Sequence, residues 1–334
     1  MTPLPHLRQI GRELFVESLA VYWGLLKIMV PVMVLVEAGT RIGLVEMLSD
    51  LCEPVMAFVG LPAETAIVLA TNLVVGLYAA GAVLVSIQGD VSLTIGNMTV
   101  LAGMMLFAHA LPVEVTIVKK AGCSLLVSLL TRLGAAFLYG WLLHLIYRGM
   151  DGFNEPATIL IAAGTDNGDG SWISWIQSSA IGLFWIYWVL LFLIVFLRIL
   201  KETGVTDFLT RMLTPVLRLI GIGPNAAPLA MVGILLGLSF GGALILREIQ
   251  KAGLNPKSIF LSMVFMGFCH SLIEDTLIAI AFGGHWSGVF VGRIVVAILL
   301  ILPISYCILK MPDRIFHSLL FKANKDIPDQ KTEK

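Results

Sequence analysis

The chain is a succession of long apolar stretches separated by short polar segments. Four long apolar stretches have the length of a membrane-crossing helix, about 20 residues, and they are residues 20–40, 123–147, 176–200 and 287–309. Four more are interrupted, the first two by glycine and small residues and the others by ionisable groups: 64–88, 225–250, 95–118 and 256–282. Two segments have the period of short amphipathic helices, 44–60 and 205–221. The pattern predicts an all-α polytopic membrane protein.

The sequence is similar to itself at a fixed offset. A shift of 161 residues aligns 43–132 with 204–293 without a gap. The matched pairs include Pro54/Pro215, Gly76/Gly237, His109/His270 and Arg132/Arg293. Apolar residues match by chance in such a chain, whereas proline, histidine and arginine rarely do, so the offset indicates an internal duplication. We therefore expect one repeat over residues 20–147 and a second over 176–309.

Three segments lie outside the repeats. Residues 1–19 mix charged and apolar positions and predict an amphipathic helix at the membrane surface. Residues 148–175 form an acidic linker between the repeats, and residues 310–334 form a basic tail.

The basic residues indicate the topology, since lysine and arginine concentrate in cytoplasmic segments. Four straight spans per repeat would place either Lys119 and Lys120 or the basic cluster at 247–257 on the wrong side. If 64–88 and 225–250 each enter the membrane and return as two half-helices, all basic clusters lie on one side. Each repeat then crosses three times, so the two repeats are inverted, as in many secondary transporters.

The predicted fold is thus two inverted repeats, each with three spans plus a re-entrant or broken-helix hairpin. Both termini are expected in the cytoplasm, the protein in the inner (plasma) membrane, and the linker on the extracytoplasmic side. Eight uninterrupted spans are the alternative. The expected hairpin breaks are Gly76, Gly81, Gly237 and Gly241, although small residues also allow close helix packing.

Composition agrees with a lipid environment. Charged residues make up 13% and hydrophobic residues 58% of the chain, against roughly 25% charged residues in soluble proteins, so the lipid bilayer is the expected partner. The 22 basic and 22 acidic residues cancel, which does not indicate nucleic-acid binding. The four cysteines form no C-x-x-C pair, and neither a Walker sequence nor a hydrolase motif is present. We expect neither an enzyme nor a cofactor.

Ionisable residues within apolar spans are candidate functional residues, because each costs roughly 2.5–3.5 kcal/mol on insertion. The candidates are His109, Glu114, Arg132, His270, Glu274, Asp275 and Arg293. For the arginines we expect structural ion pairs with the acids. The histidines either hydrogen-bond between helices or carry a proton or ligand. Pro112 is expected to open the helix between His109 and Glu114.

Part of the second repeat resembles a known family. The stretches Ser239–Glu248, Asn255–Ser258 and Phe268–Thr276 resemble the Gate, or nucleoside-recognition, domain. That domain occurs in ferrous-iron transport protein B, concentrative nucleoside transporters and spore maturation proteins A and B. The Ser-x-x-Glu-x/Thr element of the spore maturation proteins is matched by Ser271, Glu274 and Thr276. Gly242 stands where the iron transporter has a cysteine, and the first repeat matches more weakly.

The resemblance implies a permease that works by alternating access, driven by protons or another cation, for a small polar solute such as a nucleoside. Its expected midplane site is lined by residues from both repeats: His109, Glu114, Gly242, His270, Ser271, Glu274, Asp275 and Thr276. A divalent-metal permease of the ferrous-iron type and a non-transporting membrane scaffold similar to the spore maturation proteins are the alternatives. The sequence assigns no metal ligands and leaves a homo-oligomer open.

Overall fold

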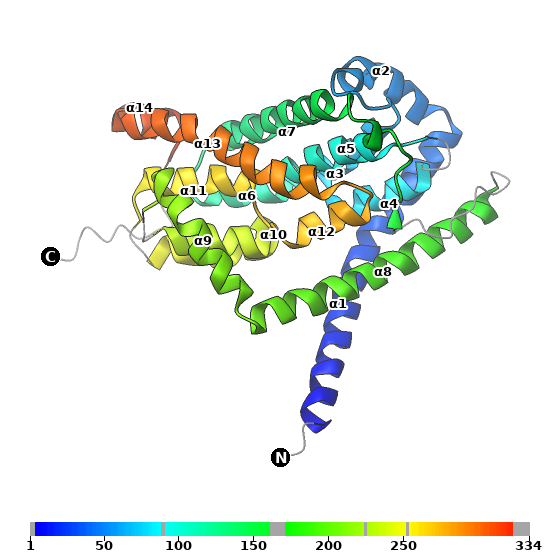
Figure 1. The fold of residues 1–334 in the computed structure, drawn as a ribbon, viewed down its shortest axis with the longest axis horizontal. Helices are drawn as coiled ribbons and strands as arrows, with labels where there is room; N and C mark the ends of the chain where they lie inside the picture. Colours follow the sequence, from blue (N-terminus) through cyan, green and yellow to red (C-terminus); the bar gives the residue numbers. More distant parts are fainter. Residues whose placement is uncertain (1–3, 88–90, 161–170, 224–225, 252–253, 323–334) are drawn as a thin grey trace.

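The computed structural model of the chain describes residues 4–87, 91–160, 171–223, 226–251 and 254–322 (Figure 1). Within these ranges the chain is helical, with isolated backbone bridges and no sheet. Up to residue 147 the described chain contains α1 (Leu4–Arg41), α2 (Leu44–Phe58), α3 (Thr65–Val74), α4 (Leu77–Ile87), α5 (Ile95–Phe107), α6 (Leu111–Lys120) and α7 (Leu125–Tyr147). The rest contains η1 (Asp151–Phe153), α8 (Trp172–Glu202), α9 (Val205–Leu219), α10 (Ala227–Lys251), α11 (Pro256–Phe268), α12 (Glu274–Ala281), η3 (Ser287–Gly292), α13 (Arg293–Lys310) and α14 (Asp313–Leu319).

Among the residues that the structure describes, five helical segments are long and apolar enough to cross a membrane: Leu14–Arg41, Ile95–Lys120, Leu125–Tyr147, Trp172–Phe196 and Ser287–Lys310. The protein is therefore an all-α, multi-pass membrane protein, as the sequence predicts. The predicted stretch 256–282 is divided into the shorter helices α11 and α12. A separate helix over residues 1–19 is not seen, because α1 runs through this boundary without a break. Residues 161–170 of the linker and 323–334 of the tail lie outside the described residues.

Elements of the first repeat recur in the second at the 161-residue offset. Helices α2 and α9 start and end at equivalent residues, and so do α5 and α11. The glycines before α2 and α9, Gly43 and Gly204, both have φ +74°. This left-handed conformation is readily adopted only by glycine, which explains why both turns keep that residue.

The predicted hairpin breaks are present at one glycine in each repeat. Gly76 (φ +127°) separates α3 from α4, and Gly237 (φ +77°, ψ 169°) interrupts α10. The prediction was wrong for Gly81 and Gly241, which lie in helical turns of α4 and α10. Both are buried, so their missing side chain serves helix packing, and one positive-φ residue is enough to interrupt each helix.

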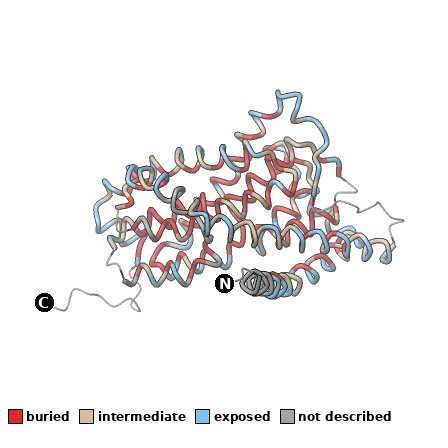
Figure 2. Tube along the Cα trace, turned by 60° about the horizontal axis from the view of Figure 1, so that its bottom comes forward, coloured by how far each residue is buried: buried red, intermediate tan, exposed pale blue. Residues whose placement is uncertain are grey.

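The core of the bundle is built on α5 and α11. Residues 98–107 of α5 and 259–268 of α11 are all buried. They pack against α7 and α13 respectively, and Figure 2 shows buried residues concentrated along the centre of the bundle. By contrast, only 17% of the apolar window of α1 and 18% of that of α8 is buried. The outer faces of these two helices contact lipid.

Helices α7 and α13, which are equivalent in the two repeats, lie antiparallel. At one end, Ser124 before α7 donates its backbone N–H to the carbonyl oxygen of Leu320, the residue after α14, which follows α13 (2.8 Å). At the other end, the hydroxyls of Tyr147 and Ser287 lie 2.7 Å apart. The start of each helix therefore lies beside the end of its counterpart (Figure 1).

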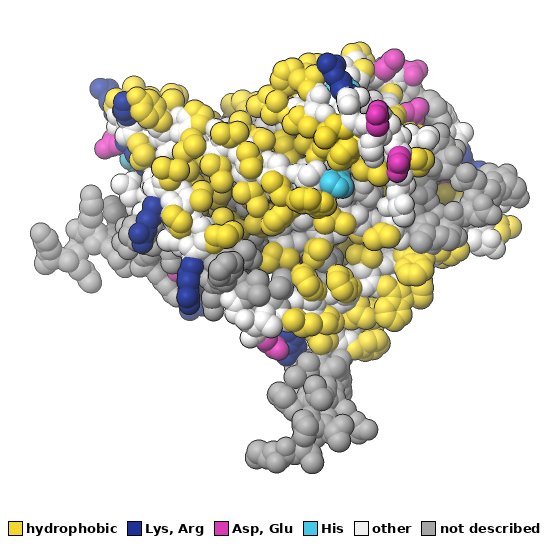
Figure 3. Space-filling view, viewed as in Figure 1, with side chains coloured by type: hydrophobic (Ala, Val, Ile, Leu, Met, Phe, Trp, Pro, Cys, Tyr) yellow, Lys and Arg dark blue, Asp and Glu magenta, His cyan; other side chains and the backbone are white. Residues whose placement is uncertain are grey.

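Charged side chains gather at the two ends of this antiparallel pair. In the view of Figure 3, most of the lysine and arginine side chains lie near α14 and α9, most of the acidic side chains lie over and beside α2 next to a basic one, and a broad hydrophobic surface separates the two groups. At the α14 end, Lys257 Nζ contacts Asp313 Oδ1 at 2.8 Å. This hydrogen bond and the lysine charge hold the pKa of the Asp313 carboxyl below its usual value.

Candidate functional site

Two helix breaks meet near the centre of the bundle. The segment between α5 and α6 contains Ala110 at φ +44°, and the segment between α11 and α12 contains Ser271 at φ +46°. These positions are equivalent at the 161-residue offset. Non-glycine residues in this conformation cost about 1–3 kcal/mol and occur preferentially at functional sites. The breaks therefore identify the segments in which functional side chains are to be sought.

Backbone hydrogen bonds tie each break to a neighbouring helix in the same way. Ala110 N donates to Asn72 O of α3 at 2.9 Å, and Ser271 N donates to Gly233 O of α10 at 3.2 Å. Asn72 and Gly233 are again equivalent. In the first repeat the Asn72 side chain also donates to Met105 O (3.2 Å) and Ala108 O (2.8 Å). These bonds satisfy carbonyls that the interrupted helix leaves without partners at membrane depth.

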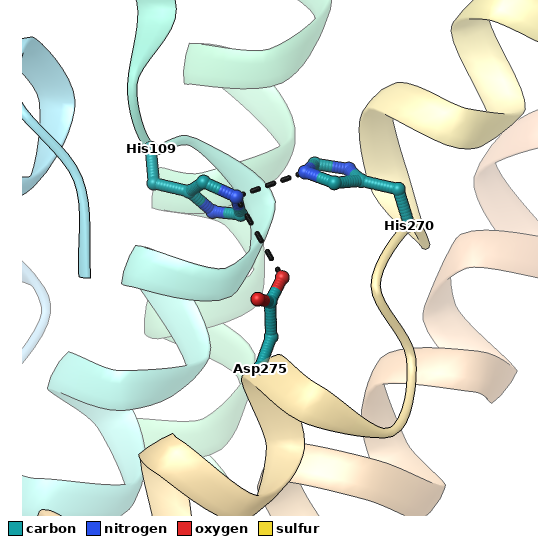
Figure 4. A group of neighbouring side chains, drawn as sticks. All are labelled: His109, His270 and Asp275. Atoms are coloured by element: carbon teal, nitrogen blue, oxygen red, sulfur yellow. Dashed lines mark hydrogen bonds and ion pairs between the residues drawn. The ribbon is translucent and has the colours of Figure 1, made fainter. Parts of the chain in front are cut away.

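One histidine from each break points toward the other (Figure 4). His109 Nε2 and His270 Nε2 lie 2.9 Å apart. The opposite ring nitrogens contact backbone carbonyls, with His109 Nδ1 3.1 Å from Met105 O and His270 Nδ1 2.6 Å from Met266 O. The His270 side chain is 1% exposed and that of His109 8%. The two rings thus form a buried contact between the repeats.

Two acidic side chains complete the cluster. Glu114 and Asp275 occupy equivalent positions in the first turns of α6 and α12, where the helix dipole stabilises negative charge. Glu114 Oε1 lies 3.5 Å from His109 Nε2 and 3.2 Å from His270 Nε2. Asp275 Oδ2 lies 3.6 Å from His109 Nε2 (Figure 4). Both carboxylates are buried.

Two buried arginines hold the ends of the broken helices. Arg132 donates to Phe107 O and His109 O at 3.1 and 3.3 Å. The equivalent Arg293 donates to three carbonyls: Phe268 O at 3.3 Å, His270 O at 2.8 Å and Leu106 O at 3.1 Å. The carbonyls at a helix C-terminus lack partners within the helix and carry partial negative charge. The arginines are therefore placed to cap α5 and α11.

The ion pairs of the two arginines are unequal. Arg132 Nη1 lies 2.5 Å from Glu114 Oε2, whereas Arg293 Nη2 lies 3.9 Å from Asp275 Oδ2. Asp275 Oδ2 accepts no hydrogen bond from the described part of the chain. The second repeat thus presents a carboxylate oxygen that is buried and only loosely held. We call the six residues His109, Glu114, Arg132, His270, Asp275 and Arg293 the central cluster.

The other predicted site residues lie around this cluster with different contacts. Glu274 Oε1 accepts a hydrogen bond from Tyr78 Oη at 3.1 Å, which joins α12 to α4. Thr276 donates its hydroxyl to the backbone oxygen of Leu272, and Ser271 is buried at the break itself. Gly242 faces α6, since a Cβ there would meet Ile117 Cδ1 at 2.6 Å. The structure therefore brings together the histidines, two acids and two arginines, but not Gly242 or Thr276.

His270 and Glu274 would share a face on a continuous helix, as the sequence suggests by their spacing. In the structure the chain is not helical between Phe268 and Glu274, so His270 is directed at His109 instead. Tyr78 was missed, because an aromatic residue in an apolar stretch is usually part of the core. Asn72 is signalled in the sequence only as an isolated polar residue.

Comparison with known proteins extends this picture. The sequence model of the Gate family, described as nucleoside recognition, matches residues 183–286. The chain carries a Gate domain. The matched segment runs from α8 to the residue before η3 and includes His270 and Asp275.

The chain is also a distant homologue of a whole membrane protein. It is 26% identical over 303 residues to the uncharacterized membrane protein YvoD of Bacillus subtilis, covering 88% of this chain and 95% of YvoD. No solved structure matches the chain. The resemblance of the sequence to the Gate domain is thus confirmed.

Proposed function

We propose that this Gate-domain protein is a cation-dependent permease that works by alternating access, with the central cluster as its cation site. The observation that carries the proposal is the contact between His109 and His270, with Nε2 atoms 2.9 Å apart. It brings together one ionisable side chain from each repeat at an interrupted helix. Discontinuous helices that meet near the midplane form the ion and substrate sites of many secondary transporters.

Inverted repeats would give this site two-sided access. The antiparallel course of α7 and α13 supports inversion, because equivalent helices in parallel repeats would run in the same direction. The contacts of two equivalent glycines support it as well. Gly122 lies against Phe321 and Lys322, near the tail, while Gly283 lies against Thr158 of the linker. In this proposal each repeat has three crossings plus a broken hairpin, and both termini are in the cytoplasm.

The identity of the transported species follows from the size and chemistry of the cluster. Its side chains contact one another directly, so the cluster as described accommodates an ion rather than a nucleoside. The description of the Gate family as nucleoside recognition supports a small polar solute, bound elsewhere between the repeats and coupled to the cation. A permease for the cation alone is the second candidate, and the geometry of the donors favours it. In neither case does the chain act as an enzyme.

Transport can be measured with purified protein in sealed proteoliposomes. A proton or divalent-cation gradient is imposed, and the uptake of the cation and of labelled nucleosides is followed. We expect gradient-dependent uptake that falls at least about tenfold in Asp275→Asn and is unchanged in the control Glu155→Gln, an exposed linker residue. Uptake that ignores both the gradient and Asp275→Asn would refute the coupling. A complete lack of transport, with partner proteins retained by both variants, would favour a scaffold.

The topology is tested separately by cysteine labelling. Lys120 ends α6 and Lys251 ends α10, and both are placed on the cytoplasmic side by the inverted arrangement. Single cysteines at 120 and 251, in a background without the four natural cysteines, should react with a membrane-impermeant reagent only from that side. Labelling from opposite sides would exclude inverted repeats.

A further inference from the structure

The hydrogen-bond partners of the two histidines determine where their hydrogens lie. Each Nδ1 contacts a backbone carbonyl, at Met105 or Met266. A carbonyl oxygen can only accept, so each Nδ1 must carry the hydrogen. A neutral imidazole has one N–H, and Nε2 of both rings is consequently a lone-pair donor. An N–H bonded to a backbone carbonyl is also the usual outer contact of a histidine that binds a metal ion, because it fixes the ring and its tautomer.

The two lone pairs face each other within the bundle. At 2.9 Å, His109 Nε2 and His270 Nε2 repel unless a positively charged species lies between them or one ring takes up a proton. Asp275 Oδ2 adds a third donor, which is buried and accepts no hydrogen bond from the described residues. The three atoms lie within 4.8 Å of one another. When both rings are neutral, the lone pairs of these three atoms are therefore directed inward, and Glu114 Oε1, 3.2 Å from His270 Nε2, accepts a hydrogen bond only if that nitrogen takes up a proton.

The spacing of the donors resembles that of metal ligands. Ligands about 2.0–2.2 Å from a tetrahedral zinc ion lie about 3.3–3.6 Å from one another. Asp275 Oδ2 lies 3.6 Å and Glu114 Oε1 3.5 Å from His109 Nε2, and Glu114 Oε1 lies 3.2 Å from His270 Nε2. The Glu114–His270 distance falls just below this range, and the 2.9 Å between the two histidine nitrogens falls clearly below it. The two rings would have to move apart by about 0.4 Å to reach the lower limit.

We propose that the central cluster binds one divalent transition-metal ion through His109 Nε2, His270 Nε2 and Asp275 Oδ2. Two imidazoles and a carboxylate suit Zn²⁺ and ions of similar preference, and are a poor set for Mg²⁺ or Ca²⁺, which take oxygen ligands. Three protein ligands leave a fourth position, as at zinc sites that exchange a ligand. Glu114 Oε1 is near enough to take that position.

The arginines weaken the hold of the carboxylates on such an ion. Arg132 already balances the charge of Glu114 at 2.5 Å, and Arg293 lies 3.9 Å from Asp275. Binding thus depends mainly on the two imidazoles. A site in which the carboxylates contribute little to binding is suited to releasing its ion. Whether the ion is the transported species or the coupling ion rests on the permease proposed above. Binding itself does not depend on transport.

The test is metal binding by the purified full chain, isolated through a tag without histidine. Equilibrium dialysis against Zn²⁺ should show one tightly bound ion per chain. Co²⁺ in the same site should give visible absorption bands that Zn²⁺ removes by competition. Lack of stoichiometric Zn²⁺ binding, or a Co²⁺ spectrum of the hydrated ion only, would overturn the proposal and leave a proton shared by the histidines. This measurement uses the unaltered protein, so it does not depend on whether variants fold.

Variants then assign the ligands. His270→Gln and His109→Gln should each lower Zn²⁺ affinity more than 100-fold, because even outer partners of metal ligands are worth about 10–100-fold. The control His317→Gln changes an exposed histidine of α14 and should bind as the unaltered protein does. Equal binding by His317→Gln and the two cluster variants would overturn the assignment. Zn²⁺ binding without transport would refute the permease but not the metal site. Proton-driven transport without Zn²⁺ binding would refute the metal site but not the permease.

Discussion

The unequal ion pairs of the central cluster lead to a quantitative prediction. Glu114→Gln removes the carboxylate that lies 2.5 Å from Arg132, where both side chains are 1% exposed. An unpaired charge then remains in the interior, which costs about 3–5 kcal/mol in buried pairs. Arg132 is then left with neutral acceptors only, the carbonyls of Phe107 and His109 and the new amide oxygen. We therefore expect a large loss in the free energy of unfolding.

Asp275→Asn is the matched change in the second repeat. Coulomb's law at an effective dielectric constant of about 20 gives an attraction of about 7 kcal/mol at 2.5 Å and about 4 kcal/mol at 3.9 Å, so roughly 2 kcal/mol separates the two pairs. Arg293 also keeps three carbonyl partners. The loss expected for Asp275→Asn is thus about 1–3 kcal/mol, smaller than that for Glu114→Gln.

Both variants can be compared by reversible unfolding in mixed micelles with increasing SDS, followed by tryptophan fluorescence. A third variant, Glu114→Leu with Arg132→Met, removes both charges and should recover most of the stability that Glu114→Gln loses, since apolar replacement of a whole buried pair is often neutral. An equal or smaller loss for Glu114→Gln than for Asp275→Asn would refute the reasoning. So would a double variant as unstable as the sum of its single changes.

Three further changes test the breaks and their supports by the same unfolding assay. Gly237→Ala places a side chain at φ +77°, ψ 169° and should cost about 1–3 kcal/mol. Its control Gly134→Ala, where a Cβ meets nothing within 4 Å, should be neutral or stabilising, and equal costs would contradict the assigned strain. Asn72→Ala leaves the Ala108 carbonyl without its donor, while the Met105 carbonyl keeps only its contact with His109 Nδ1, and should cost about 1–3 kcal/mol; no loss would mean that water replaces the amide. Tyr78→Phe removes the hydrogen bond to Glu274 and should lower stability by about 1–3 kcal/mol, and an unchanged midpoint would show that this bond adds nothing.

The repeated elements could be predicted from the sequence because duplication leaves proline, histidine and arginine at a constant offset. The same offset aligned His109 with His270 as equivalent residues, but it could not show that their rings are in contact. Contact between equivalent residues depends on how the repeats pack, and hydropathy carries no information on that. The sequence also could not show which glycine interrupts a helix. Gly76 and Gly81 lie in the same apolar stretch, and only their backbone conformations differ.

The roles of the arginines were predicted only in part. Ion pairs with the acids were expected, and the pair of Arg132 with Glu114 is present. The bonds from Arg132 and Arg293 to the carbonyls at the ends of α5 and α11 were not expected. Such bonds exist only where a helix ends, and the sequence indicated an opening near Pro112 without giving the residue at which the helix stops.

Because His109 and His270 belong to different repeats, a species that binds to both side chains also restricts the movement of one repeat relative to the other. A bound species stabilises only those conformations in which the two rings stay within reach, by an amount that grows with its affinity and reaches about 2.7 kcal/mol at a hundred times its dissociation constant. Rocking of one half against the other must first overcome that amount. An ion that binds too tightly would therefore arrest the protein, and the ions it carries fastest would be those it holds only moderately well.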